Sequence, residues 1–177
     1  MLYLITPCSR PENLQIISST IPSFCRWIVL HESHIVIPKI DNMLSIECPK
    51  TGFVGADGRN FFVDNYPLND EDWLFSLDDD NIIHPDFSII QTLLSYDASI
   101  IHWGQLNKDN SIRLRPLDQI ILDTIDAACF ISKWQYNKTV RYNTSAYHYD
   151  GLYAIECAKN GPKIKLQNYL AYYNYLK

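Results

Sequence analysis

The stretch from Asp72 to Phe87 constrains the fold more than any other part of the sequence. It begins with the short apolar run Trp73–Leu77, which is typical of a buried strand in an α/β sheet. Three consecutive aspartates, Asp78, Asp79 and Asp80, end this run. Adjacent carboxylates repel one another and are unfavourable inside a strand, so they need solvent, a cation or hydrogen-bond donors. We therefore place them at the carboxyl end of the strand, where open α/β sheets bind their ligands.

The acidic run has the chemistry of a metal site. Hard carboxylate oxygens suit Mg²⁺ or Mn²⁺, and such an ion keeps few protein ligands and shares a substrate phosphate. An apolar strand that ends in three aspartates thus indicates a metal–diphosphate site. The alternative left open is a solvated acidic turn that caps the next helix, which is predicted over residues 87–94.

Length and composition exclude several classes of protein. A chain of 177 residues forms one domain with a full hydrophobic core. A net charge of −5 and the lack of a basic cluster give no electrostatic footprint for nucleic acid. Five cysteines without C-x-x-C spacing favour reduced, mostly buried thiols in a cytoplasmic protein. No apolar run reaches the roughly 18 residues of a membrane span, so we expect no transmembrane segment and at most a peripheral contact with a membrane.

A second candidate ligand site lies at the start of the chain. Residues 2–6 predict a strand, residues 7–11 a polar turn, and residues 13–21 a helix that ends before a proline. This is the first half of a nucleotide-binding βαβ unit, whose turn faces a ligand. The turn lacks the Gly-rich pattern of a dinucleotide-binding fold. Residues 26–30 predict the second strand, and Glu32 follows it where nucleotide-binding sheets often carry an acid.

The second half of the chain supplies a further candidate acid. Strands are predicted over residues 99–105, 111–115 and 123–132, and again over 164–166. Asp150 lies near the amino end of a helix that stops at Gly161-Pro162. We expect the helix dipole to keep this carboxylate ionised near neutral pH, so that it can accept a proton from a hydroxyl group. The alternative is a plain helix cap.

Taken in order, these motifs resemble those of the GT-A glycosyltransferases, in particular the small inverting enzymes related to family 2. In that family an apolar strand ends in Asp-x-Asp and a Pro-Asp or Pro-Glu follows, as Pro85-Asp86 does here. The first turn, Ile-Thr-Pro-x-Ser-Arg-Pro, is similar to the one that holds the nucleotide base. The resemblance covers nearly the whole chain. It implies a single α/β domain over residues 1–177, with a central mixed, mostly parallel sheet flanked by helices. Residues up to about 82 would form the nucleotide-binding half and the rest the acceptor-binding half.

The same resemblance implies a role for each motif residue. Asp80 would bind Mn²⁺ or Mg²⁺ with Asp78, and Asp150 would be the catalytic base. The nucleotide would be contacted by Thr6, Pro7, Ser9, Arg10, Glu32, Arg59, Asn60, Asp78 and Asp79. The acceptor would be contacted by Trp103, Asp126 and His148, although Asp126 is equally compatible with a cap inside the sheet.

The expected reaction moves a sugar from a nucleoside-diphosphate sugar, a UDP-sugar in particular, to a hydroxyl group of a glycan or glycoconjugate, with inversion. Two other functions remain open on the sequence. One is a nucleotidyltransferase or nucleotide-sugar hydrolase with the same acidic metal site. The other is a non-catalytic sugar-binding module.

Overall fold

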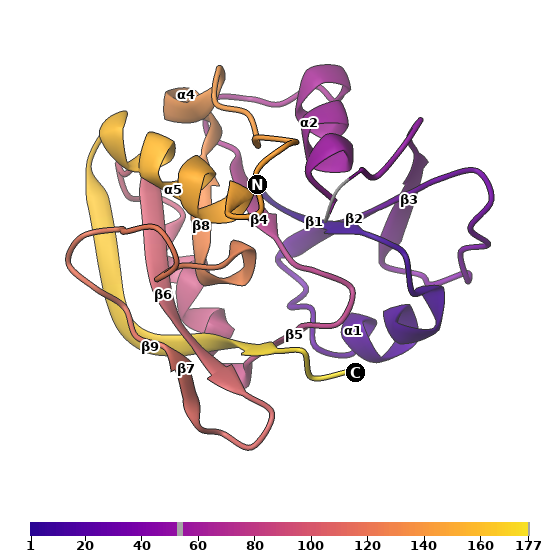
Figure 1. Ribbon diagram of the computed structural model, residues 1–177, viewed down its shortest axis with the longest axis horizontal. Helices are drawn as coiled ribbons and strands as arrows, with labels where there is room; N and C mark the ends of the chain where they lie inside the picture. Colours follow the sequence, from indigo (N-terminus) through magenta and orange to yellow (C-terminus); the bar gives the residue numbers. More distant parts are fainter. Residues whose placement is uncertain (53–54, 177) are drawn as a thin grey trace.

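The computed structural model describes residues 1–52 and 55–176 and shows an α/β fold built on one sheet (Figure 1). The strands are β1 (Leu2–Pro7), β2 (Cys25–His31), β3 (Met43–Glu47), β4 (Trp73–Ser76), β5 (Ile82–Ile83), β6 (Ile100–Asn107), β7 (Ile112–Leu114), β8 (Phe130–Lys133) and β9 (Lys163–Tyr173). The helices are α1 (Leu14–Ser18), α2 (Ala56–Asn65), α3 (Ile90–Leu93), α4 (Trp134–Asn137) and α5 (Tyr149–Lys159). Short 3-10 turns are η1 (Pro11–Asn13), η3 (Pro85–Ile89) and η4 (Ala127–Cys129).

The sheet joins a parallel block to a mixed one. Its strand order is β3-β2-β1-β4-β8-β6-β9-β5, with β7 paired to β6. β1, β2, β3 and β4 run parallel, and so do β6 and β9, whereas β8 is antiparallel to both of its neighbours. The predicted α/β fold with a mixed, mostly parallel sheet is confirmed.

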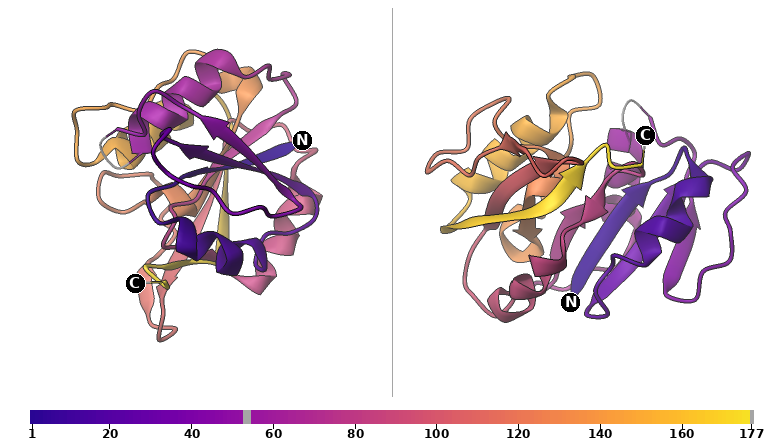
Figure 2. Two further views of the ribbon diagram at one scale, coloured as in Figure 1. Left: turned by 90° about the vertical axis from the view of Figure 1, so that its right-hand side faces the viewer. Right: turned by 90° about the horizontal axis from the view of Figure 1, so that it is seen from below.

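Helices cover both faces of the sheet, and the first strand shows why. Leu2 and Leu4 belong to the apolar cluster that includes residues of α1 and α3, whereas Tyr3 and Ile5 pack with Phe62 of α2. Successive side chains of a strand point to opposite faces, so a strand between two helical layers is apolar at every position. Figure 2 shows α2 on one side of the strands and α1 on the other.

Two predicted strands differ from the observed elements. The strand expected over residues 123–132 starts only at Phe130, because Asp126 accepts a hydrogen bond from the backbone nitrogen of Ala128 (3.1 Å) and so caps η4. The strand expected over residues 164–166 is part of β9, which runs on to Tyr173. Its pairing with β6 shifts in register near Gly104, and this irregularity accompanies its curved path around the sheet (Figure 1).

The segment after β9 is tied to the acidic run. The backbone nitrogen of Asn174 donates to the side-chain oxygen of Asn81 (2.8 Å), and that of Leu176 donates to the carbonyl of Asp80 (3.1 Å). β9 also pairs with β5, which directly follows the acidic run. The last described residues therefore hold the loop that carries the three aspartates.

Candidate active site

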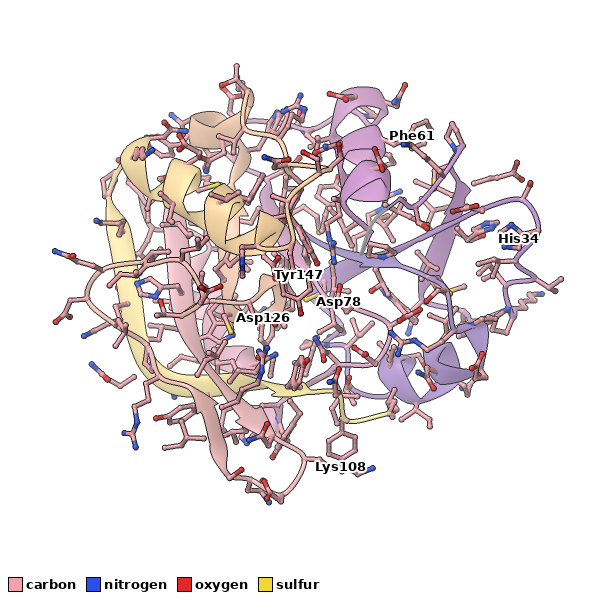
Figure 3. All side chains as sticks on the ribbon, in the orientation of Figure 1. His34, Phe61, Asp78, Lys108, Asp126 and Tyr147 are labelled. Atoms are coloured by element: carbon pink, nitrogen blue, oxygen red, sulfur yellow. The ribbon has the colours of Figure 1, made fainter. Side chains whose placement is uncertain are left out.

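A cavity of about 520 Å³ lies where the carboxyl ends of β1 and β4 face the start of α5. Its lining includes residues 7–10, 78–80 and 147–151. Figure 3 shows Asp78, Asp126 and Tyr147 gathered at the centre of the molecule. The structure therefore brings the three aspartates and Asp150 to one cavity.

Asp79 organises the first turn of the chain. One of its carboxylate oxygens accepts hydrogen bonds from the backbone nitrogens of Ser9 (2.5 Å) and Arg10 (2.7 Å) and from the Ser9 hydroxyl (2.9 Å). The other accepts from Nε (2.9 Å) and Nη2 (2.5 Å) of Arg10. Asp79 is only 2% exposed. Its oxygens are thus occupied by the protein, although Asp79 is among the residues that line the cavity, and its contact with a nucleotide stays a prediction.

The first turn itself lines the cavity at Pro7, Ser9 and Arg10, where the sequence placed the nucleotide. α2 begins close beside it. Gly55, the residue before α2, has φ 83°, and a Cβ atom there would lie 2.6 Å from the Pro7 ring. Glycine is needed both for this left-handed conformation and for the close approach.

Asp80 is paired with the same arginine. Nη1 of Arg10 lies 3.0 Å from an oxygen of Asp80, whose side chain is largely buried but still borders the cavity. Arg10 thus bridges Asp79 and Asp80, and these two contacts raise the pKa of its own guanidinium although burial opposes them. A cation at this position would therefore share Asp80 with Arg10.

Asp78 forms an ion pair with Arg59 of α2. Arg59 is completely buried, and its Nη1 also donates to the Tyr149 hydroxyl (3.3 Å). Arg59 is not among the described residues that line the cavity, and its contact with a nucleotide stays a prediction. Burial raises the pKa of Asp78 to about 6, against the opposing effect of Arg59 and with a further increase from the nearby Asp126.

Asp150 lies in the first turn of α5 and borders the cavity. One of its oxygens accepts a hydrogen bond from the backbone nitrogen of Ala127 (3.1 Å). Burial, and next the negative charge of Asp126, raise its pKa to about 7. Asp150 is therefore less readily ionised than its place at the start of a helix suggested, because burial raises its pKa. A pKa near the operating pH suits a general base better than a low one.

Solved structures with a similar arrangement of helices and strands identify the fold. The chain superposes on residues 1–349 of TarS from S. aureus with a TM-score of 0.72 and 10% identity, over 97% of this chain and 59% of that one. A second TarS structure gives 0.65 and 11%, over 97% and 36% of the two chains. The galactosyltransferase LgtC, in complex with donor and acceptor sugar analogs, gives 0.50 and 10%, over 93% and 73%. TarS and LgtC are GT-A glycosyltransferases. This chain has a GT-A glycosyltransferase fold.

The family resemblance read from the sequence is confirmed at the level of the fold. The chain spans less than two thirds of the length of the TarS chains. No protein-family model and no curated protein matches the sequence. Roles of single residues in this GT-A domain therefore have to be argued from its own geometry.

The acidic residues of the GT-A domain offer a cation few ligands. Asp78 and Asp80 both border the cavity, and their hard oxygens suit Mn²⁺ or Mg²⁺. Each is already paired with an arginine, and residues 1–52 and 55–176 hold no group of three or more acidic, histidine or cysteine side chains placed to bind a metal ion. The donor set therefore fits an ion that takes most of its ligands from a bound diphosphate and water.

Three residues expected at the nucleotide stand behind the cavity wall. Thr6 is buried, and its hydroxyl accepts a hydrogen bond from Trp27 Nε1 (3.0 Å). Glu32 accepts from the backbone nitrogen and the hydroxyl of Thr51 (3.0 Å each), and Thr51 is the residue that borders the cavity. Asn60 bonds both backbone groups of Tyr142 (2.8 and 2.9 Å). Thr6, Glu32 and Asn60 thus bond to other parts of the protein and are not among the described residues that line the cavity, and their contacts with a nucleotide stay predictions.

Trp103 also differs from its expected role. It is 2% exposed, its Nε1 donates to the carbonyl of Ala128 (2.9 Å), and its ring meets Phe75 and Phe87 edge to face. It therefore belongs to the core and offers no face to a sugar. An aromatic residue near the end of a predicted strand does not reveal on which side of the sheet its ring lies.

Asp126 and His148 do border the cavity, as expected. His148 Nδ1 lies 2.5 Å from a carboxylate oxygen of Asp123, a residue that the sequence did not single out. Arg113 of β7 and Tyr173 of β9 border the cavity as well. Arg113 was missed, because it lies in a segment that alternates like a hairpin strand and only its charge set it apart. Tyr173 is one of twelve tyrosines, and the sequence alone does not distinguish those that line a cavity from those that cover the sheet.

The raised pKa of Asp150 makes the stability of the protein depend on pH. Between about pH 4 and pH 7 the unfolded chain has released this proton while the native state still holds it, so the free energy of unfolding falls as the pH rises through this range. We expect Asp150→Asn to be about 2 kcal/mol more stable than the wild type at pH 7.5 and no more stable at pH 4.5. Urea denaturation at the two pH values measures this, with Glu156→Gln on the exposed side of the same helix as control. Equal effects of Asp150→Asn at both pH values would contradict it.

No helix in the described ranges is long and apolar enough to cross a membrane. The five cysteines are all free thiols, and four of them, Cys8, Cys48, Cys129 and Cys157, are buried. The expectation of reduced, mostly buried thiols agrees with this arrangement.

Proposed function

We propose that this protein is a metal-dependent glycosyltransferase that moves a sugar from a nucleoside-diphosphate sugar, a UDP-sugar in particular, to a hydroxyl group of a glycan or glycoconjugate, with inversion. The observation that carries the proposal is that Asp150 borders the same cavity as Asp78 and Asp80. The GT-A fold, shared with TarS and LgtC, supports it.

The charge of the cavity supports the requirement for a cation. Its described lining carries two arginines, Arg10 and Arg113, and six carboxylates: Asp78, Asp79, Asp80, Asp123, Asp126 and Asp150. A diphosphate entering this lining meets an excess of negative charge. Mn²⁺ or Mg²⁺ held by Asp80 and Asp78 would remove this repulsion and would neutralise the charge that develops on the leaving diphosphate.

The chain's own residues perform the remaining tasks. Ser9 and Arg10, fixed by Asp79, border the donor side of the cavity and orient the nucleotide. Asp150 accepts the proton of the attacking hydroxyl, and this role requires its ionised form, which prevails above about pH 7. Attack from the side opposite to the leaving diphosphate gives inversion.

A ligand panel tests the donor class. UDP and UDP-sugars with Mn²⁺, at about 100 times Kd, are expected to raise the melting temperature by about 5 °C or more, since a ligand that binds only the native state stabilises it by about 2.7 kcal/mol at that concentration. Asp80→Asn should abolish the part of the shift that needs Mn²⁺, whereas the exposed Asp86→Asn should keep it. No shift with any nucleoside diphosphate would refute the proposal.

The reaction products distinguish a glycosyltransferase from the two other functions that the sequence left open. A nucleotidyltransferase would transfer the nucleotidyl group of a nucleoside triphosphate to a sugar phosphate and release pyrophosphate. A nucleotide-sugar hydrolase would cleave the nucleotide sugar with water, in the absence of any acceptor, and release a free sugar or its phosphate. A non-catalytic sugar-binding module would leave nucleotide sugars intact in the presence of Mn²⁺. Sugar transfer that depends on an added acceptor supports the glycosyltransferase.

A further inference from the structure

One wall of the cavity is built by the second half of the chain and carries an arginine that the proposed reaction has not used. This wall contains Arg113 of β7, Asp126 before η4 and Tyr173 of β9, and Asp123 and Asp150 lie beside it. It faces the donor side formed by residues 7–10 and 78–80. We call it the acceptor wall.

Arg113 has three contacts within the protein that fix its place in the acceptor wall. Its Nη1 donates to an oxygen of Asp126 (2.9 Å) and to the side-chain oxygen of Gln105, and its guanidinium carbon lies 3.5 Å from the centroid of the Tyr173 ring. Among the described residues, Nε and Nη2 of Arg113 have no hydrogen-bond partner. These two groups form the edge with which arginine donates two parallel hydrogen bonds.

The charges around this edge are mainly negative. Asp126 neutralises Arg113, while Asp123 and Asp150 add two further carboxylates, of which Asp123 is paired with His148 (2.5 Å). Burial and then the charge of Asp126 raise the pKa of Asp150, so a proton is retained there more strongly than in water. The carboxylates of Asp123, Asp126 and Asp150 would repel an entering anion.

We propose that the acceptor wall selects an uncharged, hydroxyl-rich sugar and rejects acceptors that carry a carboxylate or a phosphate, with Arg113 binding the sugar hydroxyls and the carboxylates beside it excluding anions. Neighbouring hydroxyls of a neutral sugar accept hydrogen bonds from the free edge of Arg113 and donate to the carboxylate oxygens beside it. An anionic group could also accept hydrogen bonds from Nε and Nη2 of Arg113, but the carboxylates of Asp123, Asp126 and Asp150 would repel it. This inference rests on the proposed function, because it names the acceptor class of that reaction.

Matched pairs of sugars test the selection by charge. The protein with UDP and Mn²⁺ at pH 8 is titrated with methyl glucopyranoside and methyl glucuronide, and with the corresponding galacto pair, and binding is followed by saturation-transfer NMR. We expect at least about tenfold tighter binding of a neutral member than of its uronate, since like charges placed side by side disfavour a complex strongly. Equal or tighter binding of the uronates, or no binding of any neutral member, would overturn the inference. Signals of UDP in the same samples report separately on the proposed function, which fails if UDP does not bind.

Variants test the residues. Arg113→Lys keeps the charge but loses the two-donor edge, and it should weaken the neutral glycoside at least about fivefold while leaving UDP affinity unchanged. Asp123→Asn should narrow the difference between neutral and anionic sugars at least about threefold, and asparagine tolerates the left-handed backbone at this position (φ 67°). Asp118→Asn, in the same segment but exposed and outside the cavity, is the control. Wild-type behaviour of both Arg113→Lys and Asp123→Asn would also overturn the inference.

Discussion

Asp150→Asn is expected to lower turnover at least about a hundredfold while leaving the affinity for a nucleoside diphosphate and Mn²⁺ within a factor of two or so. Asparagine has the shape of aspartate and still accepts the hydrogen bond of the Ala127 backbone nitrogen through its oxygen. It cannot take a proton from the acceptor. Binding of the donor relies on the first turn and the acidic run, which this change leaves intact.

The pH dependence of turnover in the wild type tests the role of Asp150 as the base independently of the variant. Turnover should rise with pH through about 7 and then level off, because the ionised form of Asp150 is the active one. Initial rates of acceptor glycosylation at saturating donor, from pH 5.5 to 9, measure the profile. Glu156→Gln, on the same helix and exposed, is the matched control and should follow the wild type. Turnover of Asp150→Asn close to that of the wild type would remove Asp150 from the role of base.

Asp79→Asn is expected to destabilise the fold by about 3–5 kcal/mol, although it removes no side-chain volume. The Asp79 carboxylate accepts from two backbone nitrogens and one hydroxyl on one oxygen and from the Arg10 guanidinium on the other. An amide has one accepting oxygen only. Whichever way it turns, its NH₂ group faces donors, and a buried cation or backbone N–H loses its partner.

Urea denaturation at pH 7.5 measures this loss. Asp70→Asn serves as control, because Asp70 forms an exposed ion pair with Lys138 and should change the free energy of unfolding by less than about 1 kcal/mol. A loss below 1 kcal/mol for Asp79→Asn would show that the first turn does not depend on this carboxylate. The melting-temperature shift with UDP and Mn²⁺ should shrink in the same variant, since Ser9 and Arg10 would no longer be fixed.

Local signals predicted much of this fold. The apolar run before Asp78 and the helix that stops at Gly161-Pro162 were both readable, because hydrophobic pattern and stop signals act over a few residues. The strand before Ser132 was predicted too long, since a side-chain cap at Asp126 competes with strand pairing at short range.

Contacts between residues that are distant in sequence could not be predicted from such local signals. Asp79 was expected at the nucleotide, but it binds a turn 70 positions earlier in the chain, a choice that depends on how β1 and β4 pair. The raised pKa of Asp150 could not be predicted either, because it comes from burial and from Asp126, a residue distant in sequence. Arg113 borders the cavity because β7 pairs with β6 and because β9 curves past β6, and neither pairing can be predicted from the residues around Arg113.

The tie between the segment after β9 and the loop of Asp80 has a consequence for the order of assembly. Its hydrogen bonds join residues 93 positions apart, from Asn174 to Asn81, so they form only after the whole segment between these residues has been synthesised. The parallel block of β1, β2, β3 and β4 can dock much earlier, during synthesis. A nascent chain would thus contain the folded parallel block while the loop of Asp80 is still unsupported, and this loop would become fixed only when β9 and the segment after it have folded.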